Sequence, residues 1–416
     1  MWSSQHLQRR LGTSDAVFIG LGSMIGAGVF AAFTPAAQAA GSGLLVGLAV
    51  AAIVAACNAL ASAQLAATFP TSGGTYVYGR EQLGPWWGFL AGWSFVIGKT
   101  ASCAAMALTF ASYAAPPGWE RPVAALAIVA LAAVNYRGVT RTAQLTRIIV
   151  VLVLIALAIA VAATVSPGLP SLSEIDASGL IAAGPYGILQ SAGLLFFAFA
   201  GYARIATMGE EVRNPARSIP RAIIIALSIT IVVYAIVGVS LLGALGAEGL
   251  AATSTPLRDA AVAWQWSAPI VTIGAALASL GALLALIAGI GRTSLAMARE
   301  GDLPRWLAAV HPRFQVPHHA EVVLALVVIA LVLTLDLRGA IGFSSFGVLL
   351  YYFVANVSAF TQNTERRMFP RALFVIGAAG CLLLVATLPL LSIIGGAVVL
   401  AVGIGYRCVR LARARQ

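Results

Sequence analysis

Charged residues are scarce in this sequence: they make up 9% of its 416 residues, whereas a soluble globular domain averages about 25%. Hydrophobic residues make up 60%, and the mean hydropathy is +0.94. This balance excludes an ordinary soluble domain and indicates a polytopic membrane protein. A membrane-spanning helix needs about 20 apolar residues, so the length allows about a dozen helices with short loops. We therefore expect residues 1–416 to form a single membrane domain.

Cysteine is also rare. Cys57, Cys103, Cys381 and Cys408 lie in or beside apolar segments without CxxC spacing, so neither a zinc site nor a disulfide framework is predicted. We expect no metal and no cofactor. The net charge of +11 lies in short patches between apolar segments, which argues against a nucleic-acid partner. No small-residue cleavage site precedes the first long apolar run, so we expect that run to remain as a helix.

Apolar runs separated by polar residues predict twelve membrane spans. Their approximate limits are 15–40, 44–69, 87–113, 123–134, 145–165, 186–208, 222–245, 269–292, 322–335, 340–360, 373–386 and 388–406. The fourth, the ninth and the last two are short or weakly separated from their neighbours.

The basic residues predict the orientation, because cationic loops are retained on the cytoplasmic side. With both termini inside, the cytoplasmic segments hold twenty of the 25 basic residues: Arg9, Arg10, Arg80, Arg137, Arg141, Arg147, Arg213, Arg217, Arg221, Arg292, Arg299, Arg305, Arg313, Arg366, Arg367, Arg371, Arg407, Arg410, Arg413 and Arg415. The opposite side holds three, Arg121, Arg258 and Arg338, against the acids Glu120, Glu174, Asp176, Glu248, Asp259 and Asp336. Arg204 and Lys99, the only lysine, fall inside predicted spans.

Glycines interrupt two spans at corresponding positions. The first span contains Gly20, Gly22, Gly26 and Gly28, and the sixth span carries Gly201 in the segment FFAFAGYA. Glycine weakens a helix and lets a ligand approach the backbone. A pair of interrupted spans in corresponding places of two halves is the sequence sign of a transporter with inverted repeats and a binding site at the breaks. Close helix packing by small residues is the alternative explanation for either segment alone.

Five motifs in order resemble those of one transporter family. They are IGAGVF (25–30), FPTSGGTYVYGREQLGPWWGFLAGW (69–93), NYRGV (135–139), EEVRNPARSIPRAI (210–223) and LAMAREGDLPRWLAAVHP (295–312). Nearly the whole chain resembles the amino acid, polyamine and organocation transporter superfamily. The resemblance implies an all-α, five-plus-five inverted-repeat fold like that of the leucine transporters, with helices 1 and 6 broken. The first repeat would span residues 15–165, the second 186–360, and two extra helices 373–406.

The resemblance also implies a substrate site between spans one, three, six, eight and ten. Carried over by position, the first break and carboxylate-binding segment would be Ser23, Met24, Ile25, Gly26, Ala27 and Gly28. The second break would be formed by Phe197, Ala200, Gly201 and Tyr202, with Phe197 as a gating aromatic or, alternatively, an ordinary packed side chain. Many relatives carry an acid just after the glycine of the sixth span. Here Tyr202, Ala203 and Arg204 follow, which argues against recognition of a cationic side chain.

Lys99 lies near the middle of the third span and shares a helix face with Phe95, Ser102, Cys103 and Met106. Burying an unpaired ammonium in hydrocarbon costs several kcal/mol, so an intramembrane lysine is a functional hypothesis by default. Lys99 is therefore predicted to be a coupling residue that gains and loses a proton as the site alternates, or that replaces a bound cation. Cys103 is counted with the candidate substrate-binding residues. The alternative is a static lysine bonded to carbonyls of a broken helix in every state.

The remaining polar residues carry weaker signals. For Arg204, the sequence favours a side chain that reaches the interface or pairs with Glu210 or Glu211 over one that contacts an acidic substrate. His318 and His319 are expected to be solvated loop residues, since no cysteine or carboxylate cluster stands at metal-ligand spacing.

Other classes of function fit less well. An enzyme would need an acid–base pair, an activated nucleophile or a metal set inside the spans, and a channel would need a polar lining that continues through the membrane. The sequence thus predicts a secondary transporter, not an enzyme, in a bacterial-type inner membrane. It would move amino acids, neutral ones first, with protons as the coupling partner and the lipid bilayer around it. An exchanger or facilitator, or a polyamine or cationic amino acid carrier, remains the alternative, and the oligomeric state is left open.

Overall fold

Helices make up most of the protein in the computed structural model, which describes residues 11–71, 73–138, 143–166, 179–363, 365 and 367–413. Within these residues, β-pairing is confined to one parallel bridge between Leu11 and Val212. The predicted all-α class is confirmed.

Each predicted span corresponds to one helix or, for the first and sixth spans, to consecutive helical segments. In chain order they are α1 to α3 (Thr13–Met24, Ala27–Ala31 and Phe33–Ala40), α4 (Leu44–Thr68), α6 (Pro85–Ala114), α7 (Glu120–Tyr136), α8 (Ala143–Val165), α9 and α10 (Gly184–Phe199 and Ala203–Ala206), α11 (Pro215–Ala252), α13 (Ser267–Arg299), α14 (His318–Thr334), α15 (Leu337–Phe360), α16 (Arg371–Thr387) and α17 (Leu390–Arg413). The short helices α5 (Thr75–Leu83) and α12 (Pro256–Ala260) lie between spans.

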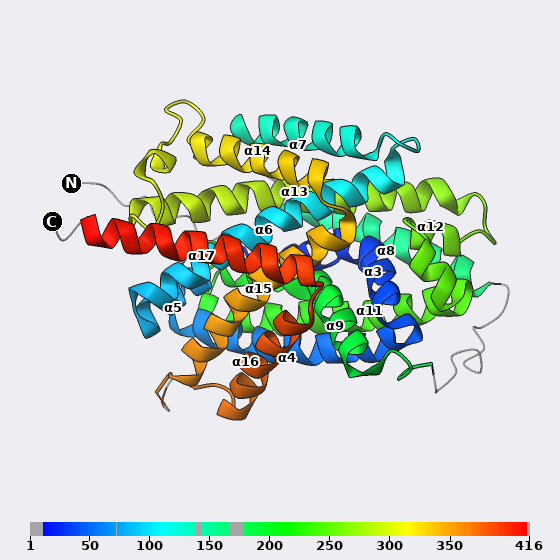
Figure 1. Ribbon diagram of the computed structural model, residues 1–416, viewed down its shortest axis with the longest axis horizontal. Coiled ribbons are helices and arrows are strands. Elements are labelled where there is room, and N and C mark those ends of the chain that lie inside the picture. The colour runs from blue at the N-terminus through cyan, green and yellow to red at the C-terminus, as the bar shows by residue number, and fades with distance from the viewer. Residues whose placement is uncertain are drawn as a thin grey trace.

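Nine helical segments of the described chain are long and apolar enough to cross a membrane unaided. The three spans outside that set, α7, α14 and α16, have 17 residues each. At 1.5 Å per residue such a helix is about 26 Å long, slightly less than the hydrocarbon core of a bilayer. Two of these helices cover one face of the molecule, since α7 and α14 pack against each other along its upper edge in Figure 1.

Helix contacts follow a two-fold pattern. Spans five positions apart touch each other: α4 with α11, α6 with α13, and α7 with α14. Other contacts also occur in equivalent pairs. Helix α1 of the first span packs on α11, and α9 of the sixth span packs on α4 in the same way. Likewise α8 packs on α13, and α15 packs on α6. This pairing is the one expected of two five-span repeats related by a pseudo-two-fold axis. The predicted five-plus-five architecture, followed by α16 and α17, is therefore present.

The two ends of the bundle carry different elements. The helix α5 and the carboxyl-terminal end of α17 lie at one end of the molecule in Figure 1, and α12 lies at the other. We call the end with α5 the basic-loop side, because most of the arginines outside the spans belong to its segments. Among the residues used to predict the orientation, Arg9, Arg10, Arg141, Glu174, Asp176, Arg366 and Arg415 lie outside the described residues.

Large apolar side chains cover much of the outer surface. On α8, Ile148, Val151, Leu152 and Ile155 are all exposed, and Leu391 at the start of α17 is 85% exposed. A soluble protein rarely exposes apolar side chains in such continuous runs. Such a surface is typical of an integral membrane protein.

Candidate functional site

The first span is broken between α1 and α2. Ile25 (φ −80°, ψ 53°) and Gly26 (φ −100°, ψ −139°) leave the helical conformation, so backbone groups on both sides of the break lose their helical partners. The hydroxyl of Tyr234 on α11 lies 2.6 Å from the carbonyl oxygen of Met24 and 3.1 Å from that of Ala198, and its one proton can be donated to either or shared between them. One tyrosine therefore contacts a carbonyl of each broken span.

The second break follows α9. A turn of 3₁₀-helix, Ala200–Tyr202, separates α9 from the four-residue α10. The two breaks are in direct contact, because a Cβ atom on Gly201 would overlap the backbone of Ser23 and Met24. Only glycine fits at that crossing. The predicted breaks in spans one and six are confirmed.

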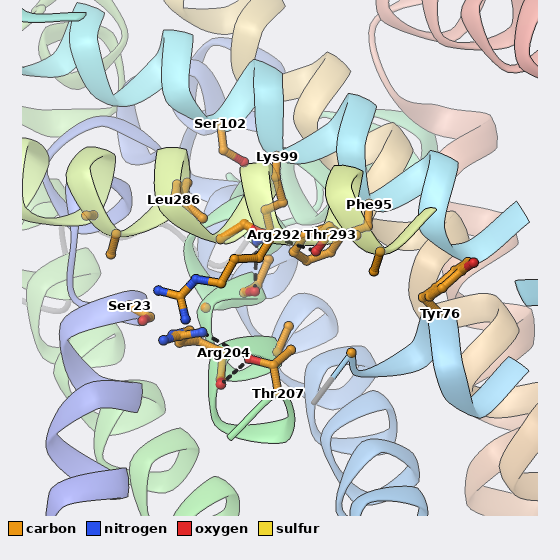
Figure 2. Close-up of a pocket in the computed structure, with 18 of the residues that line it drawn as sticks. Ser23, Tyr76, Phe95, Lys99, Ser102, Arg204, Thr207, Leu286, Arg292 and Thr293 are labelled. Atoms are coloured by element: carbon orange, nitrogen blue, oxygen red, sulfur yellow. Dashed lines mark hydrogen bonds between the residues drawn. The ribbon is translucent and has the colours of Figure 1, made fainter. Parts of the chain in front are cut away.

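A cavity of about 270 Å³ begins at these breaks and runs to the basic-loop side. Its walls come from four spans and from two connecting segments (Figure 2). The lining residues are Ser23, Gly73, Tyr76, Phe95, Lys99, Ser102, Met106, Phe197, Ala200, Gly201, Ala203, Arg204, Thr207, Glu210, Glu211, Ala282, Ala285, Leu286, Gly289, Arg292, Thr293 and Ala296. Spans one, three, six and eight contribute as expected, whereas none of these residues belongs to span ten.

The opposite side of the breaks is packed shut. Phe30 on α2 is 1% exposed, and its ring meets that of Tyr113 edge-on with 5.8 Å between the centroids. The Tyr113 hydroxyl donates to the Phe30 carbonyl at 3.1 Å. Gly28 lies directly against the backbone of Ala198. These contacts close the cavity on the side of the breaks away from the basic-loop side.

The structure separates the predicted site residues into two groups. Ser23, Lys99, Phe197, Ala200 and Gly201 line the cavity. Met24, Ile25, Gly26, Ala27, Gly28, Tyr202 and Cys103 are not among the residues of its wall.

Two of the side chains outside the cavity wall have clear reasons for their positions. Tyr202 is fully buried and stacks on Tyr352 of α15, with 4.8 Å between ring centroids. Cys103 is also fully buried, although Ser102 and Met106 of the same helix line the cavity. The lining face of α6 passes through Phe95, Lys99, Ser102 and Met106, which leaves the thiol at its edge.

Lys99 connects the third span to the second break. Its ammonium donates to the carbonyl of Ala200 at 3.0 Å, as the dashed line in Figure 2 marks, and the side chain is only 6% exposed. The hydroxyl of Tyr352 donates to the same carbonyl at 3.2 Å. Among the described residues, no carboxylate forms an ion pair with Lys99. The buried ammonium of Lys99 is thus hydrogen-bonded to a backbone carbonyl at the helix break.

Close packing holds Lys99 in this place. Helices α6 and α15 cross at Gly98 and Gly347, where a Cβ atom on Gly347 would come within 2.7 Å of the Gly98 backbone. One turn further along, the hydroxyls of Ser102 and Ser344 hydrogen-bond at 2.6 Å. This helix crossing fixes the position of Lys99 along α6 relative to the second break.

The side chain of Arg204 lies just after the second break and has one hydrogen-bond partner in the described part of the chain. It lines the cavity and donates to the hydroxyl of Thr207 at 3.3 Å, and no ion pair joins it to Glu211. Arg292 of α13 lines the same cavity, and sequence analysis did not select it. Its position near the end of the eighth span looks like an ordinary interface arginine. No sequence signal shows that two arginines from different repeats converge.

Two other expectations change on α14. His318 and His319 are its first residues and not loop residues, and the Nδ1 atom of His319 lies 2.9 Å from the carbonyl oxygen of Trp306. Glu321, one residue before the predicted start of the ninth span, is 3% exposed and packs beside Gly291 of α13. No group of three or more His, Cys, Asp or Glu side chains in the described part of the chain is placed to hold a metal ion.

A buried ionic network borders the cavity on the basic-loop side. Asp302, in the segment after α13, forms an ion pair with Arg407 of α17 and accepts a 3.0 Å hydrogen bond from Tyr76. Arg80 of α5 bonds both Asp302, at 3.4 Å, and Glu300, at 2.9 Å. Burial, and then the carboxylate of Asp302, raise the pKa of Tyr76 above its usual value. Because Tyr76 also lines the cavity, the network connects the last helix to the cavity wall.

The family model for amino acid permeases matches residues 11–407, nearly the whole chain. The chain belongs to the amino acid permease family. An uncharacterized transporter of Mycobacterium tuberculosis is 58% identical over 415 residues, which cover 99% of this permease and 94% of the relative. The branched-chain amino acid permease BcaP of Bacillus subtilis is 27% identical over 339 residues, covering 76% of this permease and 72% of the relative.

A solved structure supports the same fold. MhsT in complex with L-phenylalanine matches with a TM-score of 0.64 and 15% identity, over 94% of this permease and 99% of that chain. At this identity the match bears on the fold alone, and it agrees with the five-plus-five repeat derived from the helix contacts. The resemblance found in the sequence motifs is confirmed by these comparisons. The protein is an integral membrane transporter of the amino acid permease type.

Proposed function

We propose that this permease is a secondary active transporter of neutral amino acids that works by alternating access and couples transport to protons through Lys99. The observation that carries the proposal is the joint position of the two helix breaks and Lys99 at the closed end of a one-sided cavity. A cavity of about 270 Å³ suits a ligand of amino-acid size, since sites for drug-sized ligands start at about 300 Å³.

The lining near the breaks supports a substrate without a charged side chain. Phe95, Met106, Phe197 and Ala282 give this part of the wall an apolar character. A second ammonium on the substrate would need a counter-charge there, and the charge closest to the breaks is the ammonium of Lys99 itself. Cationic amino acids and polyamines are therefore the weaker candidates.

Lys99 supplies a physical route for coupling. While it carries a proton, the ammonium makes a charge-assisted hydrogen bond to the carbonyl of Ala200 and holds α6 against the second break. Loss of the proton removes the charge and weakens that bond, so α6 and the broken sixth span can separate. A change in protonation then favours a change in which side of the site is open.

The test is uptake of individual labelled amino acids into proteoliposomes without sodium, with and without an inward proton gradient. Accumulation of a neutral amino acid only in the presence of the gradient is the expected result. Counterflow that does not respond to the gradient would replace the proposal by an exchanger or facilitator. Uptake of lysine or putrescine in preference to neutral amino acids would refute the neutral specificity.

A further inference from the structure

The cavity contains a pair of arginines that the transport function has not used. Arg204 comes from the second repeat just after the sixth-span break, and Arg292 comes from the inner end of the eighth span. Figure 2 shows both guanidinium groups directed into the same part of the cavity, and the positive charge of Arg292 acts on that of Arg204. Arg204 is half-buried and Arg292 is exposed. Their like charges repel each other, and an anion bound between them would relieve that repulsion.

Glu210 and Glu211 line the same cavity, but no ion pair within the described residues joins either arginine to a carboxylate. The ion pairs there involve other arginines, and the only hydrogen bond of the Arg204 guanidinium goes to the neutral hydroxyl of Thr207. The carboxylate of Glu321 lies near enough for Arg292 to act on its charge, yet no ion pair joins the two side chains. Arginine presents a planar set of donors that matches a carboxylate with two parallel hydrogen bonds.

Glu211 adds a negative charge to the same part of the cavity. It lines the cavity, and its charge acts on that of Arg204. Its backbone is fixed, because its carbonyl accepts a 3.1 Å hydrogen bond from the amide of Leu11. A carboxylate beside two guanidinium groups complements a zwitterion better than a simple anion, since the ligand's ammonium then also has a partner.

We propose that Arg204, Arg292 and Glu211 form a second amino-acid site on the basic-loop side of the cavity, where the guanidinium groups bind the substrate carboxylate and Glu211 binds its ammonium. This site rests on the proposed transport function and lies between the helix breaks and the basic-loop side. A substrate that leaves the breaks toward that side would pass this second site on its way out.

The two sides of the membrane distinguish this site from the one at the breaks. Exchange of a labelled amino acid is measured in right-side-out and inside-out membrane vesicles that contain the full chain. Cys408 of α17 reports which side faces the medium, because it is exposed whereas Cys57, Cys103 and Cys381 are buried. Reaction of Cys408 with a membrane-impermeant maleimide then gives the fraction of each orientation.

In Arg204→Gln and Arg292→Gln, the half-saturating amino acid concentration on the basic-loop side is expected to rise about tenfold, equivalent to about 1.4 kcal/mol. The value on the opposite side is expected to stay near that of the wild type. Arg217→Gln is the matched control, because Arg217 is exposed at the start of α11 and does not line the cavity. An equal rise on both sides, or no rise on either, would overturn the second site.

Inhibition experiments identify which group of the amino acid the arginines bind. A primary amine that lacks the carboxylate should inhibit wild type and arginine variants equally, and unequal inhibition would exclude a carboxylate contact. Inhibition by sodium acetate that the variants abolish, with unchanged amino acid saturation, would assign the pair to a free anion and overturn the proposal. If an arginine variant does not fold, Glu211→Gln provides a second test. This variant should weaken the binding of amino acids more than the binding of acetate. If wild-type vesicles move no amino acid, the proposed function itself fails, before any variant is compared.

Discussion

Replacement of Lys99 by glutamine separates a coupling role from a structural one. Glutamine can still donate an N–H group to the carbonyl of Ala200, but it cannot titrate. The lost charge-assisted bond is worth about 1.5–3 kcal/mol. Burial of a lysine at the centre of a span costs about 2.5–3.5 kcal/mol on insertion scales. These amounts nearly cancel, and the carbonyl of Ala200 keeps the hydrogen bond from Tyr352, so we expect little change in thermal stability.

Transport should respond very differently. With one proton carried per substrate, each pH unit of gradient supports about a tenfold accumulation. We expect wild-type uptake to fall as external pH rises, because fewer carriers bind a proton before they turn over. Lys99→Gln should equilibrate the amino acid without concentrating it, with exchange that no longer varies with pH.

The assay is labelled uptake into proteoliposomes at several external pH values, with melting temperature measured on the same preparations. Thr109→Val is the control on the same helix, since the Thr109 hydroxyl bonds only the carbonyl of Ala105 within α6. A Lys99→Gln protein that still concentrates substrate with the wild-type pH profile would refute the coupling role. A large loss of stability in that variant would show instead that the lysine holds the fold together.

Three other outcomes are expected. Gly201→Ala should abolish transport and lower the melting temperature, because its Cβ would overlap the first break, whereas Gly405→Ala, with open space around it, should be silent in both assays. Asp302→Asn should lower the free energy of unfolding by about 3–5 kcal/mol, because it leaves the charge of Arg407 buried without its partner, and denaturation of Asp302→Leu combined with Arg407→Leu should recover much of that loss. Cys408 should react with an impermeant maleimide in inside-out vesicles but not in intact cells, and the reverse pattern would contradict both termini being cytoplasmic.

The arrangement of spans could be predicted because it depends on local composition. Twelve apolar runs became twelve spans, and the predicted end of the seventh span at residue 245 precedes Gly246, which leaves the helical conformation with φ 66°. The broken spans were also predictable, because glycine changes backbone preference wherever it stands.

The cavity wall depends on side chains that meet from distant segments, and the sequence contains less about these. Cys103 was predicted on the lining face because it lies four residues after Lys99, but the lining face passes through Ser102 instead and leaves Cys103 buried. Arg292 was missed because nothing near it in the chain marks Arg204 as its neighbour. Glu321 lies one residue before the predicted start of the ninth span at residue 322, whereas α14 begins at His318 and buries the carboxylate in its first turn.

The bridge between Leu11 and Val212 has a mechanical consequence for the transport cycle. The amide of Leu11 donates to Glu211, and the amide of Arg213 donates back to Leu11 at 2.8 Å, so the segment before α1 is joined to the segment after α10. These two segments lead into the halves of the broken spans that face the basic-loop side. We expect the bridge to couple these two halves, because a displacement of either segment would be passed to the other through two backbone hydrogen bonds. A conformational change that opens or closes the cavity on this side would then move both half-helices together.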